Sequence, residues 1–407
     1  MKQNAVVAGV GMTRFGKHLD RGLADLAHEA IRAALDDAGI AIGDVQAVWA
    51  GTAGASVITG QVCIAGQAIV RSLGLGDVPV VNVENACATS STAFQQACSF
   101  VTAGIHDVVL AFGVEKLYHH DRARTFSVFA GCVDVEKPRD VDAFLTGDLD
   151  PTALDARPSR KRSVFMDIYS RWARDYMAQS GATAQDFAAI SAKNSVHGRL
   201  NPKAQFHNVV TIEEVLGSEM IAPPLTMLMC SPLGDGASAA VIMSPAAAAR
   251  YGIRRPVKVL SSLLTSGQDL SPGVPSIAQI GAKRAYEQAG VGPEEIDIVE
   301  LHDASSPAEM IYYESLGLCA VGDGPKMIAE GTTSLGGRVP VNTSGGLVRK
   351  GHPIGATGIS QIYELVLQLR GDAGARQVNG ARIALAENGG GFIGGDAAAL
   401  TMTVLGR

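Results

Sequence analysis

Residues 36–51, DDAGIAIGDVQAVWAG, match residues 287–302, EQAGVGPEEIDIVELH, in the order of their apolar, glycine and acidic positions. A second match pairs residues 104–113, GIHDVVLAFG, with residues 380–389, GARIALAENG. The alternative is chance similarity between ordinary helix–turn–strand units. Because the two matches keep their order along the chain, we interpret them as an internal repeat, which predicts two similar halves.

Apolar strands alternate with amphipathic helices through the chain, which predicts an α/β protein. We place the N-terminal half at residues 1–250 and the C-terminal half at residues 256–407. Residues 116–225 fit neither half and include a charged stretch, so we interpret them as an insertion in the first half. The apolar sequence that follows residue 225 marks the return to a buried strand.

The composition argues against several classes of protein. The chain has 407 residues, of which 47% are hydrophobic and 18% charged, and such a chain is not disordered. Its net charge of −6 predicts no electrostatic footprint for nucleic acid. No apolar run reaches the ~18 residues that span a membrane, and the start, MKQNAVVAGVGMTRFG, lacks a signal-peptide pattern. We therefore expect a cytoplasmic protein with no membrane or nucleic-acid partner.

Cys87 is the candidate nucleophile. Residues 78–84, VPVVNVE, read as a β-branched strand, and a helix pattern follows the cysteine. A thiol at a helix N-terminus has free backbone N–H groups and the helix dipole beside it, which lowers its pKa. The alternative is a buried, inert cysteine, the usual state of a free thiol.

Two histidines occupy unusual positions. His302 follows a predicted buried strand, at the carboxyl edge where α/β sites collect. His352 lies in a glycine-rich loop directly before a predicted helix, and Pro353 restricts its backbone. With Cys87, they suit acyl transfer through a thioester: the cysteine attacks a carbonyl, one histidine removes its proton, and the other donates to the carbonyl oxygen.

Other motifs indicate neither a dinucleotide nor a metal. Residues 389–394, GGGFIG, spell G-x-G-x-x-G, but the following DAAALTMTVL reads as a strand rather than a helix. His119, His120 and Asp121 offer no clear third ligand group, and the six cysteines contain no C-x-x-C pair. We expect no bound metal.

The sequence resembles the thiolase superfamily over nearly the whole chain, in particular sterol-carrier-protein-type and archaeal-type thiolases. The most specific motif is NTSGGLVRKGHPIGATG at 342–358. Residues 85–94, NACATSSTAF, resemble the nucleophile loop of that family, and residues 302–305, HDAS, resemble its HDAF or HDCF motif. Residues 187–206 and 231–242, FAAISAKNSVHGRLNPKAQF and SPLGDGASAAVI, also resemble that family.

The resemblance implies a five-layered αβαβα fold of two similar halves with an inserted loop domain at about 116–225, a homodimer, and coenzyme A thioesters as substrates. Coenzyme A is then a substrate, and no cofactor is bound permanently. Cys87 would be acylated, His352 would activate it, and His302 would help bind the thioester oxygen. The backbone at Cys87 and near Gly389 would form a second oxyanion hole.

One departure from the family concerns the second cysteine that thiolases use to move a proton at the α-carbon. Most place it in a C-x-G motif of the last glycine-rich loop, and others place it in HDCF. Here the first position holds Glu387 and the second holds Ala304. A buried Glu387 with a raised pKa could replace it. The alternative is a structural Glu387, with His302 or His352 carrying the proton.

The function expected is an acyl-CoA C-acyltransferase that cleaves a β-ketoacyl-CoA with free coenzyme A, or runs the reverse condensation. The first alternative is a thiolase-like carbon–carbon lyase (a retro-aldolase), or a C-acyltransferase, that acts on a bulky steroid or aromatic thioester. The second is a non-catalytic or lipid-binding subunit. Related enzymes work with a small partner that carries a zinc ribbon and an OB fold. Because the second cysteine is missing, such a partner-dependent role is an open alternative for this chain.

The densest basic run is RPSRKR, with Arg157, Arg160, Lys161 and Arg162. Its place in the insertion suggests contacts with the phosphates of coenzyme A. The alternative is a solvated surface run.

Overall fold

The computed structural model describes residues 3–146, 162–271 and 273–407, and it shows a mixed α/β protein, as the sequence predicts. Among these residues, nine strands form one sheet in the order β3-β2-β4-β7-β1-β8-β11-β10-β9. A separate small sheet pairs β5 with β6. The strands are β1 Ala5–Met12, β2 Ala47–Gly51, β3 Val80–Val83, β4 Val108–Glu115, β5 Met220–Ala222, β6 Leu225–Thr226, β7 Gly236–Met243, β8 Val257–Ser266, β9 Ile298–Glu300, β10 Ile383–Gly390 and β11 Ala399–Gly406.

The large sheet has two parts of similar topology, joined where three residues at the start of β1 pair with β8. In one part β2 runs parallel to β4, which is antiparallel to β7. In the other part β9 runs parallel to β10, which is antiparallel to β11. The segments matched in the sequence repeat therefore end in strands with equivalent neighbours. The domain boundaries at residues 250 and 256 stay a prediction.

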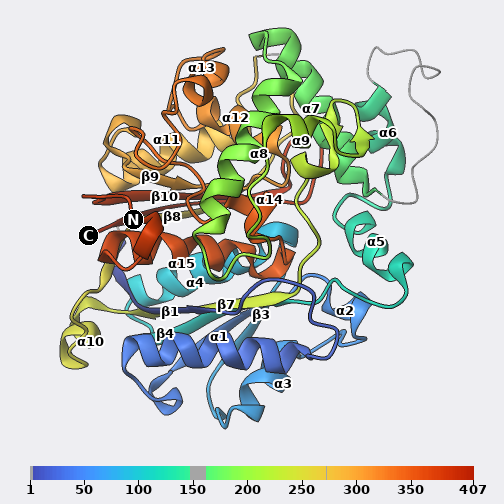
Figure 1. Ribbon diagram of the computed structural model, residues 1–407. Helices are drawn as coiled ribbons and strands as arrows, with labels where there is room; N and C mark the ends of the chain where they lie inside the picture. The colour runs from blue at the N-terminus through green and yellow to red at the C-terminus, as the bar shows by residue number, and fades with distance from the viewer. Residues whose placement is uncertain (1–2, 147–161, 272) are drawn as a thin grey trace.

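Figure 1 shows five layers, with α4 and α15 between the two parts of the sheet, α1 and α3 on one outer face, and α11 and α12 on the other. The helices of at least eight residues are α1 Leu23–Ala38, α3 Ala65–Ser72, α4 Thr89–Thr102, α5 Arg122–Ala130, α6 Pro138–Thr146, α7 Val164–Ser180, α8 Ala184–Arg199, α11 Ile277–Ala289, α12 Ser306–Ser315 and α15 Thr357–Arg370. The shorter helices are α2 Ala55–Ile58, α9 Ile212–Leu216, α10 Pro245–Arg250, α13 Gly324–Ala329 and α14 Gly346–Lys350.

The outer helix α1 shows how sequence sets the packing. Its apolar positions lie on one face, and its chain reverses at Gly39, which adopts the left-handed conformation with φ of 66°. The helix packs so closely on β1 that a Cβ at Gly9 would lie 2.3 Å from the carbonyl oxygen of Ala34. Only glycine allows this approach of the helix to the strand.

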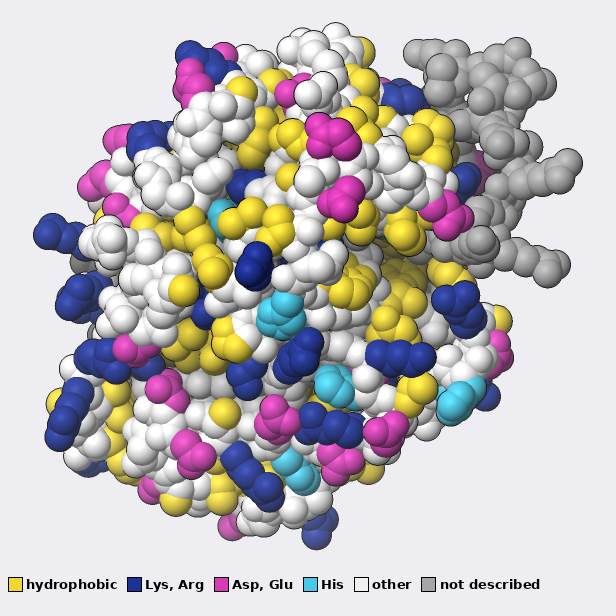
Figure 2. Space-filling model, in the orientation of Figure 1, with side chains coloured by type: hydrophobic (Ala, Val, Ile, Leu, Met, Phe, Trp, Pro, Cys, Tyr) yellow, Lys and Arg dark blue, Asp and Glu magenta, His cyan; other side chains and the backbone are white. Residues whose placement is uncertain are grey.

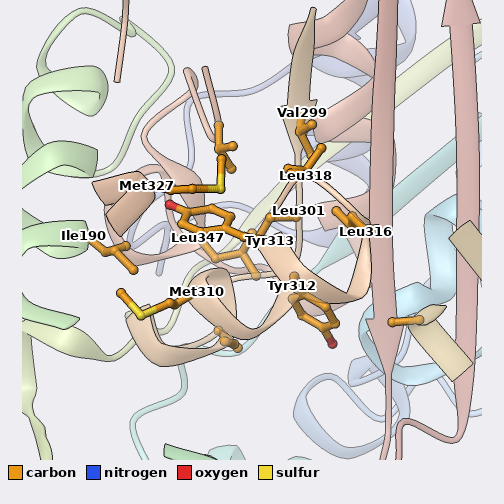
Figure 3. Close-up of a cluster of buried hydrophobic side chains, with 14 of the residues drawn as sticks. Ile190, Val299, Leu301, Met310, Tyr312, Tyr313, Leu316, Leu318, Met327 and Leu347 are labelled. Atoms are coloured by element: carbon orange, nitrogen blue, oxygen red, sulfur yellow. The ribbon is translucent and has the colours of Figure 1, made fainter. Parts of the chain in front are cut away.

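The region between β4 and β7 holds α5 to α9 and the small sheet, and it lies over the side of the molecule where the halves meet (Figure 1). Helix α8 joins it to the second half through a shared core, in which Ile190 packs near Met310 and Leu347 (Figure 3). No helix in the described ranges is long and apolar enough to cross a membrane.

Candidate active site

Cys87 lies in a 3-10 turn, Ala86–Ala88, between β3 and α4, and its side chain is buried. The turn is held by its neighbours: the Glu84 carboxylate accepts from the N–H of Ala86 at 2.6 Å. The Thr89 hydroxyl donates to the Ala86 carbonyl at 2.7 Å. Ala86 itself has φ of 47°, a left-handed conformation that costs a non-glycine residue free energy. A strained, well-held turn thus fixes the thiol at the start of the helix.

His302 follows β9, as the sequence predicts, and is buried. Its backbone N–H donates to Oε2 of Glu387 at 2.9 Å. The next residue, Asp303, accepts from the side chain of Asn194 at 3.0 Å and from the N–H of Leu347 at 2.6 Å. Strand β10, helix α8 and the segment at residues 342–358 therefore all hold the loop that carries His302.

His352 lies between α14 and α15, and its Nδ1 lies 2.8 Å from the Thr357 hydroxyl. That hydroxyl lies 3.1 Å from the Pro353 carbonyl, which can only accept. The hydroxyl therefore donates to Pro353 and accepts from Nδ1 of His352. This assigns the proton to Nδ1 and leaves Nε2 as an acceptor.

The structure brings the three predicted residues together. The Cys87 sulfur and a ring nitrogen from each of His302 and His352 lie within 4.8 Å of one another. The two imidazole rings have centroids 5.0 Å apart and meet edge to face. A Cys–His–His set of this kind can also bind zinc, but acyl transfer needs the thiol free.

Burial controls the protonation of this group. It raises the pKa of the Cys87 thiol well above its ordinary value of 9.0, although the backbone N–H groups of Gly391 and Cys87 act in the opposite direction. The lowered pKa expected from the helix N-terminus is therefore wrong for this buried thiol. Burial also lowers the pKa of His302 to about 4. Burial, with His302 and Lys350 nearby, lowers the pKa of His352 well below its ordinary value.

Both imidazoles are therefore neutral at pH 7, and the thiol keeps its proton. A neutral imidazole can accept that proton when a carbonyl carbon approaches the sulfur. The arrangement fits general-base activation during attack rather than a thiolate formed in advance.

Glu387 lies within β10 and is fully buried. Burial raises the pKa of its carboxyl to about 8, although the backbone N–H groups of His302 and Gly389 act in the opposite direction. Its Oε1 has no hydrogen-bond partner within the described part of the chain. A Cβ placed on Gly389 would lie 3.6 Å from Oε1 and 3.6 Å from the Tyr312 hydroxyl. Oε1 of Glu387 therefore lies near Gly389 and Tyr312, two residues that line the cavity, although Glu387 itself does not line it.

The last glycine-rich loop also reaches the thiol. Gly389 lines the cavity, but its N–H is directed to the Glu387 carboxyl. Gly391 supplies the backbone N–H beside the Cys87 sulfur. The oxyanion role of Gly389 stays a prediction, and Gly391 is a donor that the sequence interpretation missed.

Glu115 was also missed, although it organises the site. Its buried carboxylate accepts from the N–H groups of Ala53, Gly54 and Gly355, each at 3.0 Å. Burial raises the pKa of this carboxyl to about 7. Because Gly355 precedes α15, Glu115 ties the first half to the loop that carries His352. A single glutamate at the end of a strand forms no sequence motif, so the sequence alone does not identify Glu115.

A cavity of about 980 Å³ opens at this group and is lined by Cys87, His302 and His352. Its lining also includes Lys17 and Arg122, which are exposed, and Arg349, which is buried. On this face, Figure 2 shows hydrophobic side chains in a hollow with Lys, Arg and His side chains along its rim.

The predicted basic run is only partly placed. Arg157, Arg160 and Lys161 lie outside the described residues. Arg162 lines the cavity, and its guanidinium pairs with Asp167 at 2.9 Å and donates to the Ile221 carbonyl at 2.9 Å.

The two motifs set aside in the sequence have other structural roles. Residues 389–394 end β10 and lead into a turn before β11, without a following helix. Nδ1 of His119 accepts from the N–H of Asp121 at 2.9 Å. Within the described residues, Cys87, His302 and His352 form the only group with metal-ligand spacing.

Two family descriptions together cover most of the chain. Residues 5–246 match the thiolase N-terminal domain, and residues 263–405 match the thiolase C-terminal domain-like family.

Curated proteins are similar over nearly the whole chain. Acetyl-CoA acetyltransferase of Methanothermobacter thermautotrophicus is 38% identical over 402 residues, covering 97% of this chain and 98% of that protein. Benzoylsuccinyl-CoA thiolase subunit BbsB of Thauera aromatica is 34% identical over 391 residues, covering 93% and 92%. Sterol carrier protein 2 of Bos taurus is 36% identical over 406 residues, covering 97% and 71%.

Solved structures share the fold. The Ltp2-ChsH2(DUF35) aldolase has a TM-score of 0.78 at 26% identity, covering 99% of this chain and 98% of that chain. Human mitochondrial 3-ketoacyl-CoA thiolase has a TM-score of 0.70 at 17% identity, covering 100% and 99%. The second likeness is evidence of the fold alone.

Proposed function

Because the chain belongs to the thiolase family, we propose that it cleaves a β-ketoacyl-CoA with free coenzyme A, or runs the reverse condensation, through an acyl-cysteine on Cys87. Members of this family share the thiolase fold and an acyltransferase activity. The observation that supports Cys87 is the convergence of its thiol with His302 and His352 within 4.8 Å.

In the cleavage direction, the Cys87 sulfur attacks the β-carbonyl carbon and passes its proton to Nε2 of His352. The bond between the α- and β-carbons then breaks, and its electron pair stays on the α-carbon, which takes up a proton. The thiol of free coenzyme A next attacks the acyl-cysteine. This releases the shortened acyl-CoA and returns Cys87 as a thiol. We propose that His302, whose Nε2 has no hydrogen-bond partner among the described residues, donates to the substrate oxygen.

The direct test supplies acetoacetyl-CoA and longer β-ketoacyl-CoA thioesters with free coenzyme A and follows thiolysis. Release of two acyl-CoA products, with an acyl-cysteine trapped when coenzyme A is omitted, supports the proposal. Cleavage that releases a free ketone or aldehyde, with no acyl-cysteine, contradicts it and supports the retro-aldolase alternative.

We keep that alternative because the solved neighbour with a TM-score of 0.78 is described as an aldolase. The same description names a second protein, ChsH2(DUF35), and we extend to this chain the proposal of a small zinc-ribbon/OB-fold partner. The thiolysis test is therefore run with and without such a partner. Full activity of the chain alone makes the partner unnecessary.

We also propose a homodimer. Strand β3 lies at one edge of the sheet, so one side of its backbone has no strand neighbour among the described residues. Val81 and Asn82 of this strand are exposed. An uncovered edge strand pairs readily with a second copy. The cytoplasmic location stays a prediction.

We expect His352→Ala to slow acylation of Cys87 by at least ~10²-fold, the scale of a lost general base. The reason is that Nδ1 of His352 is bonded to Thr357, which leaves Nε2 as the nitrogen that can accept the thiol proton. Single-turnover acylation by an acyl-CoA, followed by intact-protein mass, measures the effect. His106→Ala, at a ring that stacks on Phe100 away from the cavity, is the matched control. An unchanged rate in His352→Ala assigns the base elsewhere.

The rim of the cavity should bind the phosphates of coenzyme A. Arg122 is exposed on this rim and has no ion-pair partner in the described part of the chain, whereas Arg162 is paired with Asp167. We expect Arg122→Ala to raise KM for coenzyme A by about threefold to tenfold with kcat unchanged, as for a surface charge pair. Arg284→Ala, on α11, is the control. Arg160→Ala and Arg162→Ala test the sequence prediction, and an unaltered KM in all three loop and rim variants contradicts phosphate binding here.

A further inference from the structure

The cavity beside Cys87 has one wall of aromatic side chains. Tyr169 and Trp172 of α7 meet edge to face with ring centroids 5.3 Å apart. Trp172 lies 6.1 Å from Phe392, which in turn lies 4.8 Å from Phe144. Tyr169, Trp172 and Phe392 line the cavity, whereas Phe144 packs behind them. The rings thus form a continuous surface rather than isolated contacts.

This wall begins next to the reacting sulfur. Phe392 directly follows Gly391, whose N–H lies beside Cys87, and it is buried. Tyr169 lines the same cavity as Cys87, and burial, with a smaller contribution from the Cys87 thiol, raises the pKa of its phenol well above the ordinary value. An acyl group on Cys87 would therefore extend along the aromatic surface.

Two tyrosine hydroxyls add polar points to this part of the cavity. Tyr169 and Tyr312 both line it, and neither hydroxyl has a hydrogen-bond partner in the described ranges. Figure 3 shows the ring of Tyr313 within the hydrophobic cluster, while the hydroxyl of the adjacent Tyr312 points away from that cluster. A saturated chain would cover both hydroxyls without a partner, which disfavours its binding.

We propose that this pocket is the acyl subsite and that it selects an aromatic acyl group over a straight or saturated one. The proposal rests on the acyl-cysteine mechanism and names its substrate class. A flat ring gains edge-to-face and offset contacts with Trp172 and Phe392 beyond the area that it buries, and one such contact contributes about threefold to tenfold in binding. The ring or an oxygen on it also accepts from the tyrosine hydroxyls.

The test uses the first half-reaction alone. The Cys87 sulfur forms a bond to the thioester carbonyl carbon, the bond from that carbon to the sulfur of coenzyme A breaks, and the thiol proton leaves on the released coenzyme A. We compare initial acylation rates for benzoyl-CoA, cyclohexanecarbonyl-CoA, hexanoyl-CoA and acetyl-CoA by intact-protein mass, each as kcat/KM.

We expect benzoyl-CoA to exceed cyclohexanecarbonyl-CoA and hexanoyl-CoA by at least about tenfold. Equal rates for the two rings overturn selection by aromaticity, and a preference for hexanoyl-CoA or acetyl-CoA overturns the aromatic class while leaving the acyl-cysteine intact. If no thioester gives an adduct, the proposal that Cys87 forms an acyl-cysteine is contradicted.

Two variants locate the selectivity. Phe392→Leu keeps an apolar side chain but removes the ring, so the ratio of benzoyl to hexanoyl rates should fall by about threefold to tenfold. Phe144→Leu removes a ring that does not line the cavity and should keep the ratio. Because the readout is a ratio within one protein, a general loss of folding does not imitate it. A ratio that is unchanged in Phe392→Leu contradicts the assignment of this wall.

Discussion

Cys87→Ala should abolish the acyl adduct and reduce thiolysis by at least ~10⁴-fold, because loss of a covalent nucleophile removes the two-step route altogether. The turn around the cysteine is held by Glu84 and Thr89 rather than by the sulfur, so the variant should fold. Intact-protein mass after incubation with an acyl-CoA, without free coenzyme A, gives the readout.

Cys132→Ala is the matched control, because Cys132 is a second thiol that lines the same cavity. It should keep one adduct per chain. An adduct that survives in Cys87→Ala, or disappears in Cys132→Ala, would move the nucleophile to another group.

The fold was accessible from the sequence because its elements alternate in a repeated order. The pattern over residues 22–38 ends at Gly39, and the structure has α1 at Leu23–Ala38 with that glycine in the left-handed conformation. The two repeated segments end in β2 and β9, which have equivalent neighbours. Sequence could not show the joining of the two parts through β1 and β8, because register between distant strands leaves no local pattern.

The grouping of the site was also predictable, but its electrostatics were not. Cys87, His302 and His352 stand out because each follows or precedes an element at a distinctive turn. The direction of the Cys87 pKa shift was wrong, since the helix N-terminus is visible in sequence and the degree of burial is not. Burial destabilises the thiolate by more free energy than the helix N-terminus contributes to stabilising it.

The sequence interpretation missed the cavity-lining residues that lie within helices. Tyr312 lies within α12, where its neighbour Tyr313 faces the core, and a pair of adjacent tyrosines does not reveal which one faces a cavity. Tyr169 and Trp172 share a face of α7 and resemble ordinary core positions at helical spacing. Only tertiary structure separates a face on a core from a face on a cavity.

The position of Glu387 supports the proposal that it replaces the second cysteine. Its Oε2 accepts from the N–H of His302, its Oε1 has no hydrogen-bond partner among the described residues, and a Cβ on Gly389 would lie 3.6 Å from Oε1. Burial raises its pKa to about 8, so protonated and ionised forms both exist near neutral pH. A group with such a pKa can both take and return a proton at an α-carbon.

Glu387→Gln should therefore cut exchange of the α-proton of an acceptor thioester in deuterated water by about 10³-fold, while Cys87 acylation stays within about threefold. In the wild type the ionised form removes the proton, so exchange should rise with pH up to about 8 and then level off, and in the variant it should lack this rise.

The pKa of Glu387 in the folded protein lies above the ordinary 4.5, so wild-type stability should fall relative to the variant as pH rises from about 4.5 to about 8. Thermal melts across that range show whether the glutamine occupies the same buried site. If exchange persists at the wild-type rate, a histidine carries the proton and Glu387 serves only to hold the loop of His302.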